Sequence, residues 1–295
     1  MSTIMGKVDK EPLRLVVIVA NQLDKRIYDY SKSLQLYVDW IGKKFAELFL
    51  TVREDFEFRG FEIAVHNCTV ADFRRTHKAT RRDKPDIYLV FFVGQFSHFA
   101  SCATSEFLNY FVIPEKFMKT LPATLDNEDE WSNKNRNNLS ELLSHLVHEI
   151  CHTLGAFHAD NGIMSKHIEM LPDNESRLKN IKFLNFIDKK SLTIICESMS
   201  IITTFKPKRH LRCDDDVLTY NSDQSIAAVF FVKGHRYIDN SYFEFTYLDA
   251  MKSYTTQMAP EGWEKFVVVH FCGHIYRYDR LDVTTTGKCT RAIEF

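Results

Sequence analysis

The residues with the clearest chemical potential lie between His148 and His158, in the pattern H-E-x-x-H-x-x-G-x-x-H. Two His four positions apart project from one face of a helix, so His148 and His152 could bind the same metal ion. Glu149 points partly toward that space and is placed to hold a metal-bound water rather than the metal. Gly155 permits a left-handed turn after the helix, which would bring His158 back as a third ligand.

Three neutral nitrogen ligands with one open position are typical of a catalytic zinc site, whereas a structural zinc site is usually closed by four protein ligands. Zn²⁺ lowers the pKa of its bound water to about 7, and Glu149 would take the proton as that water attacks a carbonyl group. The alternative is a buried amphipathic helix with incidental histidines. That alternative requires three His, one Glu and one Gly to fall at these fixed offsets by chance. At ordinary residue frequencies, the probability of this anywhere in a chain of this length is about 1 in 10⁴ or less.

At these positions the chain resembles the metzincin zinc peptidases. Met164, six residues after His158, would correspond to their Met-turn, which lies beneath the metal and supports the site together with the turn at Gly155. The resemblance covers roughly the first 200 residues and is specific between His148 and Met164. It implies a zinc-dependent endopeptidase with a twisted sheet, two long helices and a substrate cleft.

A narrower resemblance is to intracellular zinc metallopeptidases of fungi and other eukaryotes, which have a short gap between the third His and a Gly-Ile-Met turn and a β-rich C-terminal region. The chain departs from other metzincin groups. Ala159 follows the third His where the snake-venom-like group has Asp, and Lys166 stands where the astacin-like group has a Tyr ligand. No pair of cysteines brackets the Met-turn.

Composition bounds the remaining possibilities. The 295 residues carry a formal net charge of −1, so no overall field recruits nucleic acid or acidic lipid. Seven cysteines without CxxC spacing favour free thiols in a reducing compartment. With neither a signal peptide nor an apolar run of about 20 residues, we expect a cytosolic or nuclear protein that does not engage membranes. The oligomeric state is left open.

The hydrophobic pattern predicts an α+β fold. The resemblance implies that residues 1–204 form a metzincin-like protease domain, with a twisted mixed sheet and the active-site helix, and that a small antiparallel β-rich domain follows over 205–295. Apolar runs predict strands, and three- and four-residue spacing predicts a helix. The expected N-terminal elements are strands at 13–20, 61–65 and 87–93 and a helix from 24 to about 50. By resemblance, the region 94–105 is expected to form the upper rim of a cleft, where an edge strand would pair with an extended peptide substrate.

Asn138 and Glu141 form a capping pattern that predicts the start of the zinc helix, after a polar loop from 125 to 138. Asp188 could cap a second helix through Cys196. The stretch 205–216 has the composition of a linker, and strands are expected at 226–232, 242–247 and 265–278.

Several other residues could carry chemistry, but each has a simpler interpretation. His145 on the zinc helix is expected either to support the ligands from outside or to lie at the surface, since three ligands are already supplied. Cys151 on the same helix is expected to pack as a small apolar residue. The basic run 74–84 lacks interleaved aromatic residues and suits a solvated loop better than a phosphate contact. His270 and His274 need not share a face, so a second metal site is not expected there, and Asp214–Asp216 suit a solvated charge run.

The sequence therefore predicts a peptidase that acts on peptides or proteins, with Zn²⁺ held by His148, His152 and His158 and Glu149 as general base. Alternatives stay open: a DNA-associated protease of the crosslink-repair type that uses the basic run, and a non-catalytic binding module that retains the zinc site. A third alternative is an active peptidase whose C-terminal β-rich region binds other proteins and selects the substrates.

Overall fold

The computed structural model describes most of the chain, with gaps. The described residues are 13–19, 26–52, 60–67, 88–94, 100–105, 108–122, 124–126, 128, 131–165, 168, 171, 178–199, 207–214, 216–234, 241–281, 283, 288–289 and 293–294. The basic run 74–84 and Lys166 lie outside them. No helix among these residues is both long and apolar enough to cross a lipid bilayer.

The chain forms two compact units. One unit contains 10–153 and 161–188, and the other contains 1–9, 154–160 and 189–295. The boundary expected between residues 204 and 205 stays a prediction.

The first unit is built on a five-stranded sheet in the order β2-β1-β3-β5-β4. Its strands are β1 (Leu13–Val19), β2 (Phe61–Asn67), β3 (Tyr88–Gly94), β4 (Ala100–Ser105) and β5 (Leu108–Pro114). The pairs β1–β2, β1–β3 and β3–β5 are parallel, and β4 runs antiparallel to β5 at one edge. The sheet is therefore mixed, as predicted, and the region 94–105 does supply an edge strand.

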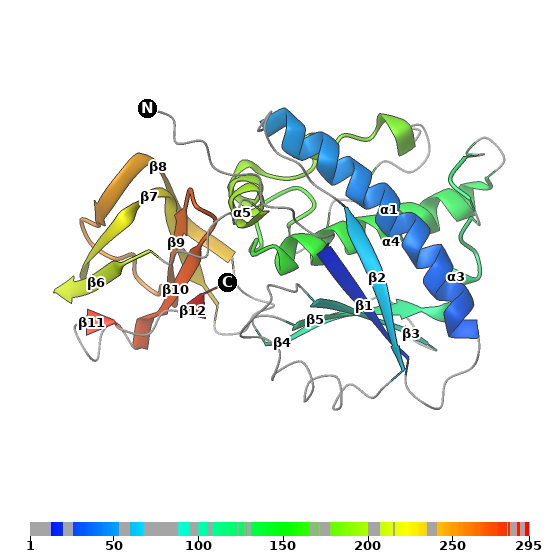
Figure 1. Cartoon of the computed structure of the whole chain (residues 1–295), viewed down its shortest axis with the longest axis horizontal. Helices are drawn as coiled ribbons and strands as arrows, with labels where there is room; N and C mark the ends of the chain where they lie inside the picture. Colours follow the sequence, from blue (N-terminus) through cyan, green and yellow to red (C-terminus); the bar gives the residue numbers. More distant parts are fainter. Residues whose placement is uncertain are drawn as a thin grey trace. The chain divides into compact units, whose positions relative to one another are not determined.

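Helices α1 (Arg26–Val52) and α4 (Asn133–Thr153) cover one face of this sheet (Figure 1). The periodic apolar side chains of α1 are all buried, which confirms the expected helix face: Leu34, Tyr37, Val38, Ile41, Phe45 and Leu48. Shorter elements complete the unit: α3 (Glu115–Met118), η2 (Leu178–Asn180) and η3 (Phe183–Asn185).

Helix α4 begins at Asn133, so the prediction that Asn138 caps it was wrong and the expected loop is shorter. The backbone N–H of Asn135 donates to Ser132 Oγ at 3.2 Å, which is the geometry of an N-cap at Ser132. Asn138 lies inside the helix, and its side-chain amide donates to Thr120 Oγ1 at 2.7 Å. A tertiary partner thus accommodates a residue that sequence alone assigns to a helix end.

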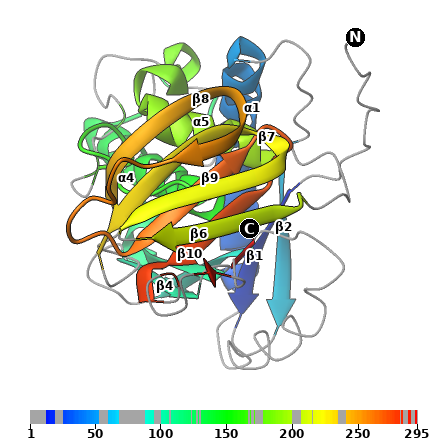
Figure 2. The same ribbon diagram turned by 90° about the vertical axis from the view of Figure 1, so that its left-hand side faces the viewer.

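The second unit is a seven-stranded antiparallel sheet in the order β11-β6-β7-β9-β10-β12, with β8 paired to β7 (Figure 2). Its strands are β6 (Arg209–Asp214), β7 (Val217–Lys233), β8 (Ser241–Thr255), β9 (Lys265–His270), β10 (Ile275–Asp279), β11 (Lys288–Cys289) and β12 (Ile293–Glu294). The predicted antiparallel β-rich region and the α+β class are confirmed.

The expected linker at 205–216 was wrong over residues 209–214, which form β6. This strand makes a hairpin with β7, and Asp216 takes a left-handed conformation at the turn, with φ of 63°. Only Leu211 of β6 is buried, so its sequence carries a weak strand signal. The predicted strand 265–278 is two strands, β9 and β10, which a turn at Gly273 separates.

Helix α5 (Lys189–Met199) begins directly after Asp188, close to its predicted start, and packs on this sheet. Ile194 of α5 and Phe157 belong to one buried cluster with residues of β7, β8, β9 and β10. The short segment 154–160, which carries His158, is thereby part of the core of the second unit.

Candidate metal centre

The apolar face of α4 sets the rotation of the helix. The predicted core residues of this face are at most 1 % exposed: Leu139, Leu142, Leu143, Leu146, Val147 and Ile150. His148, Glu149 and His152 are also buried, at 4, 4 and 7 % exposure. Burying a polar side chain costs free energy unless it has a hydrogen-bond or metal partner, so these three side chains require polar partners inside the protein.

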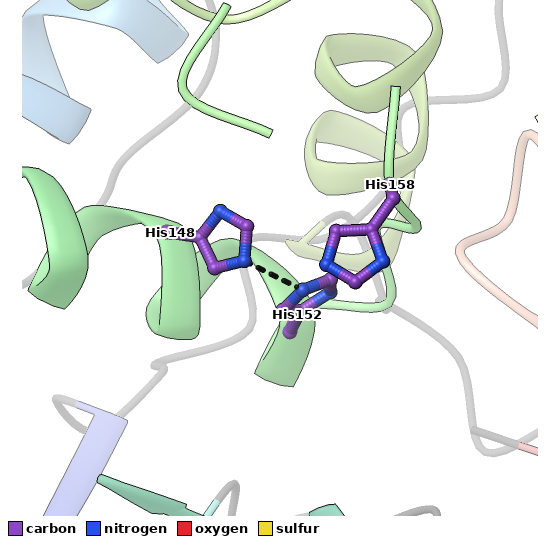
Figure 3. Close-up of side chains that lie close together, drawn as sticks. All are labelled: His148, His152 and His158. Carbon is purple, nitrogen blue, oxygen red and sulfur yellow. Dashed lines mark hydrogen bonds between the residues drawn. The ribbon is translucent and has the colours of Figure 1, made fainter. Parts of the chain in front are cut away.

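His148 and His152 face each other, as their four-residue spacing predicted. Their Nε2 atoms lie 3.0 Å apart and their rings are perpendicular (Figure 3). His148 Nδ1 lies 2.6 Å from the carbonyl oxygen of Ile163. A carbonyl only accepts, so Nδ1 carries the proton and Nε2 keeps a free lone pair. This is the tautomer that a metal ligand needs, and the backbone of Ile163 selects it.

His158 joins the pair after a turn. Helix α4 ends at Thr153, and Gly155 has φ of 97°, a left-handed conformation that a Cβ disfavours. Candidate ligand atoms of His148, His152 and His158 all lie within 4.8 Å of one another (Figure 3). The three sequence-predicted ligands therefore converge.

The triad fits a zinc ion. Two tetrahedral ligands at about 2.0–2.1 Å from Zn²⁺ lie about 3.3 Å apart, close to the observed Nε2 separation. Lone pairs that face each other at this distance repel unless a cation or proton lies between them. Among the residues that the structure describes, this is the one group of three or more His, Cys, Asp or Glu side chains with that proximity.

A tight turn at residues 162–165 supports His148. Gly162 has φ of 75°, and a Cβ there would lie 2.5 Å from the carbonyl oxygen of Phe186. The N–H of Ile163 donates to that same oxygen at 2.8 Å, and Met164 is fully buried. The backbone contacts of Ile163 and Phe186 escaped sequence analysis, because a carbonyl group leaves no signal in residue type.

Four other residues considered as candidates do not belong to the triad: His145, Cys151, His270 and His274. His145 Nδ1 donates to the carbonyl of Glu141 at 2.7 Å, and burial lowers the pKa of its ring. Burial, with Asp188 and Glu149 nearby, raises the pKa of the Cys151 thiol, which suits the predicted packing role. His270 and His274 form no metal-sized group with a third such residue in the described part of the chain.

Comparison with known proteins places the triad in a recognised context. Residues 54–182 match the family model described as Matrixin, a metzincin family whose members bind zinc. No curated protein matches the chain. Among solved structures, the crystal structure of wild-type OgpA from Akkermansia muciniphila is similar at 11 % identity, with a TM-score of 0.45, over 96 % of this chain and 92 % of that chain.

The predicted resemblance to metzincin zinc metallopeptidases is thus confirmed over the segment that holds His148, His152 and His158. The family match and the converging imidazoles together support a zinc metallopeptidase.

Proposed function

We propose that this chain is a zinc-dependent endopeptidase of the metzincin type. His148, His152 and His158 hold the ion, Glu149 is the general base, and Gly155 and Met164 shape the site. The observation that carries the proposal is the convergence of the three buried imidazoles within 4.8 Å, in a segment that matches the matrixin model. When bound, zinc supplies Lewis-acid chemistry: it acidifies water and polarises a carbonyl group.

The protein residues divide the remaining work. Glu149 follows the first His on the same helix and is buried, so its carboxylate can accept a proton from the attacking water within a low-dielectric site. The same carboxyl group can then pass this proton to the leaving amine. Proton transfer by a positioned side chain contributes about 10²- to 10⁴-fold to rate.

The substrate class that fits is a peptide or protein. The edge strand β4 offers main-chain groups to an extended peptide, in the way that peptide-binding sheets recognise partners. No observation favours the DNA-associated alternative, since the basic run 74–84 lies outside the described residues. The binding-module alternative is distinguished by turnover.

Glu149→Gln tests the assignment of the base. The amide keeps the size of the side chain but cannot accept the proton, so we expect peptide turnover to fall about 10²- to 10⁴-fold while bound zinc stays near one per chain. Turnover on a peptide library and zinc content by elemental analysis would be measured together.

Glu141→Gln is the matched control, because it makes the same chemical change two turns earlier on α4. It should cleave like the parent. If Glu149→Gln also cleaves like the parent, Glu149 is not the base. If the parent binds zinc but cleaves nothing, the binding-module alternative holds.

A further inference from the structure

The third candidate ligand lies outside the helix, so something else must hold it. His148 and His152 are fixed by the hydrogen-bonded backbone of α4, but His158 lies five residues beyond its end at Thr153. The intervening Gly155 has the widest conformational range of any residue. A ligand on such a segment binds a metal tightly only if its backbone is fixed elsewhere, because ordering a loop costs conformational entropy.

Tyr242 contacts the segment on both sides of His158. The backbone N–H of Phe157 donates to Tyr242 Oη at 3.0 Å, and the backbone N–H of Tyr242 donates to the carbonyl of His158 at 3.1 Å. His158 also forms a parallel β-bridge with Ser241. These contacts hold the backbone at the N–H of Phe157 and at the carbonyl group of His158, on either side of the Cα atom that carries the imidazole.

The contacts of Tyr242 are shielded from water. Its side chain is 7 % exposed, and its hydroxyl also hydrogen-bonds Ser191 Oγ on α5 at 3.2 Å. Phe157 packs edge-on against Tyr242 and Phe230, with ring centroids 5.8 and 5.7 Å away, and the Arg277 guanidinium lies 4.5 Å from its ring centroid. The backbone of the ligand segment is therefore held by a packed core rather than by a surface contact.

We propose that Tyr242 is a positioning residue for the metal site: its hydroxyl and its backbone N–H pre-organise His158 as the third ligand. It acts through His158 and touches neither metal nor substrate. The antiparallel sheet of residues 207–294 is then a structural part of metal binding, not an accessory that selects substrates. This inference rests on the proposed zinc function, but metal binding tests it without any measurement of cleavage.

Tyr242→Phe removes the hydroxyl and keeps the ring in the core. The N–H of Phe157 then loses its acceptor, so we expect the dissociation constant for Zn²⁺ to rise about 10- to 100-fold, the range seen when an outer-shell contact is removed. Competition with a chromogenic chelator gives this constant. In Co²⁺-loaded protein, the visible ligand-field bands of Tyr242→Phe should also change in position and intensity, since they report ligand geometry.

Tyr220→Phe is the matched control. It removes a buried hydroxyl from the same sheet, where Tyr220 Oη hydrogen-bonds His270 Nε2 at 2.9 Å. It should lower the unfolding midpoint about as much as Tyr242→Phe does, yet keep the parent affinity for zinc and the parent Co²⁺ spectrum. Ser191→Ala, which removes the second partner of Tyr242 Oη, should weaken zinc binding less than Tyr242→Phe does.

Parent affinity in Tyr242→Phe would overturn the inference, and so would an equal loss of affinity in Tyr242→Phe and Tyr220→Phe, because the effect would then be general to the sheet. Failure of the parent protein to bind Zn²⁺ would instead overturn the proposed function.

Discussion

At the scale of single residues, the contact between His148 and Ile163 determines which nitrogen can bind metal. The proton sits on Nδ1 because its partner is a carbonyl oxygen at 2.6 Å, and this leaves Nε2 free to face His152. The motif places two imidazoles on one helix face. The turn at residues 162–165 provides the Ile163 carbonyl oxygen, which accepts from Nδ1 and so selects the His148 tautomer with Nε2 unprotonated. Gly162 is required for this because a Cβ would meet the Phe186 carbonyl.

His270 shows how burial controls a histidine outside the site. Its Nδ1 donates to the carbonyl of Ser225 at 3.2 Å, and its Nε2 accepts from Tyr220 Oη at 2.9 Å, so the neutral ring satisfies both neighbours. Burial is the main reason that the pKa of His270 falls to about 4. The unfolded chain, with an ordinary His pKa of about 6.5, takes up the proton at higher pH than the folded chain does.

The sign of the resulting pH dependence follows from this difference. The stabilisation from a neutral His270 is complete above about pH 6.5 and is lost as the pH falls toward 4, by about 3 kcal/mol in total. Urea unfolding of the parent and of His270→Gln at several pH values would measure it. The gap between the two free energies of unfolding should narrow on acidification, and a gap independent of pH would contradict the prediction.

At the scale of elements, two serines of α4 hydrogen-bond Leu171, which follows the tight turn at residues 162–165. Ser144 Oγ accepts from the N–H of Leu171 at 2.8 Å and donates to the carbonyl of Ser140 at 2.7 Å, while Ser140 Oγ donates to the carbonyl of Leu171. Ser144 and Ser140 are both buried. These bonds satisfy both backbone groups of Leu171, which would be costly to bury unpaired.

Ser144→Ala should therefore destabilise the protein by about 1–3 kcal/mol, because it leaves the buried N–H of Leu171 without its acceptor. Chemical denaturation would give the change in free energy of unfolding. Thr193→Ala on α5 removes a hydroxyl bond within one helix, to the carbonyl of Lys189 at 2.9 Å, and should cost under about 0.5 kcal/mol. Equal costs in the two variants would show that the link to Leu171 is unimportant.

At the scale of the whole molecule, metal binding is coupled to stability, since a ligand that binds only the folded chain stabilises it. The three imidazoles proposed as ligands come from a helix and from the segment beyond it, so they come together only after folding. Zinc at about 1,000 times its dissociation constant would add about 4 kcal/mol. We expect removal by a chelator to lower the thermal unfolding midpoint by about 7 °C for a chain of this size.

The same measurement on variants separates binding from catalysis. Glu149→Gln should keep the full chelator-induced shift, because its ligands are intact. His152→Ala should lose most of it, since two imidazoles hold zinc far less tightly than three do. If chelation leaves the parent midpoint unchanged, zinc does not bind the folded chain tightly.

The sequence by itself determined the convergence of His148, His152 and His158, the apolar face of α4 and the antiparallel character of the C-terminal region. All depend on spacing within one short segment, where helix and strand periodicities translate directly into geometry. It misplaced the start of α4 and missed β6, because Ser132, Asn138 and Leu211 carry weak local signals whose meaning depends on distant partners.

Only the tertiary structure decided what holds the triad. The Ile163 carbonyl that orients His148 is 15 residues from it in the sequence, and Tyr242, which hydrogen-bonds Phe157 and His158, is 84 residues from His158. Backbone acceptors look alike in every residue type, and a buried tyrosine in a strand resembles any other core aromatic. Which carbonyl group contacts His148 and which tyrosine contacts the segment 154–160 depends on the packing of the folded chain, and no local sequence pattern encodes that packing.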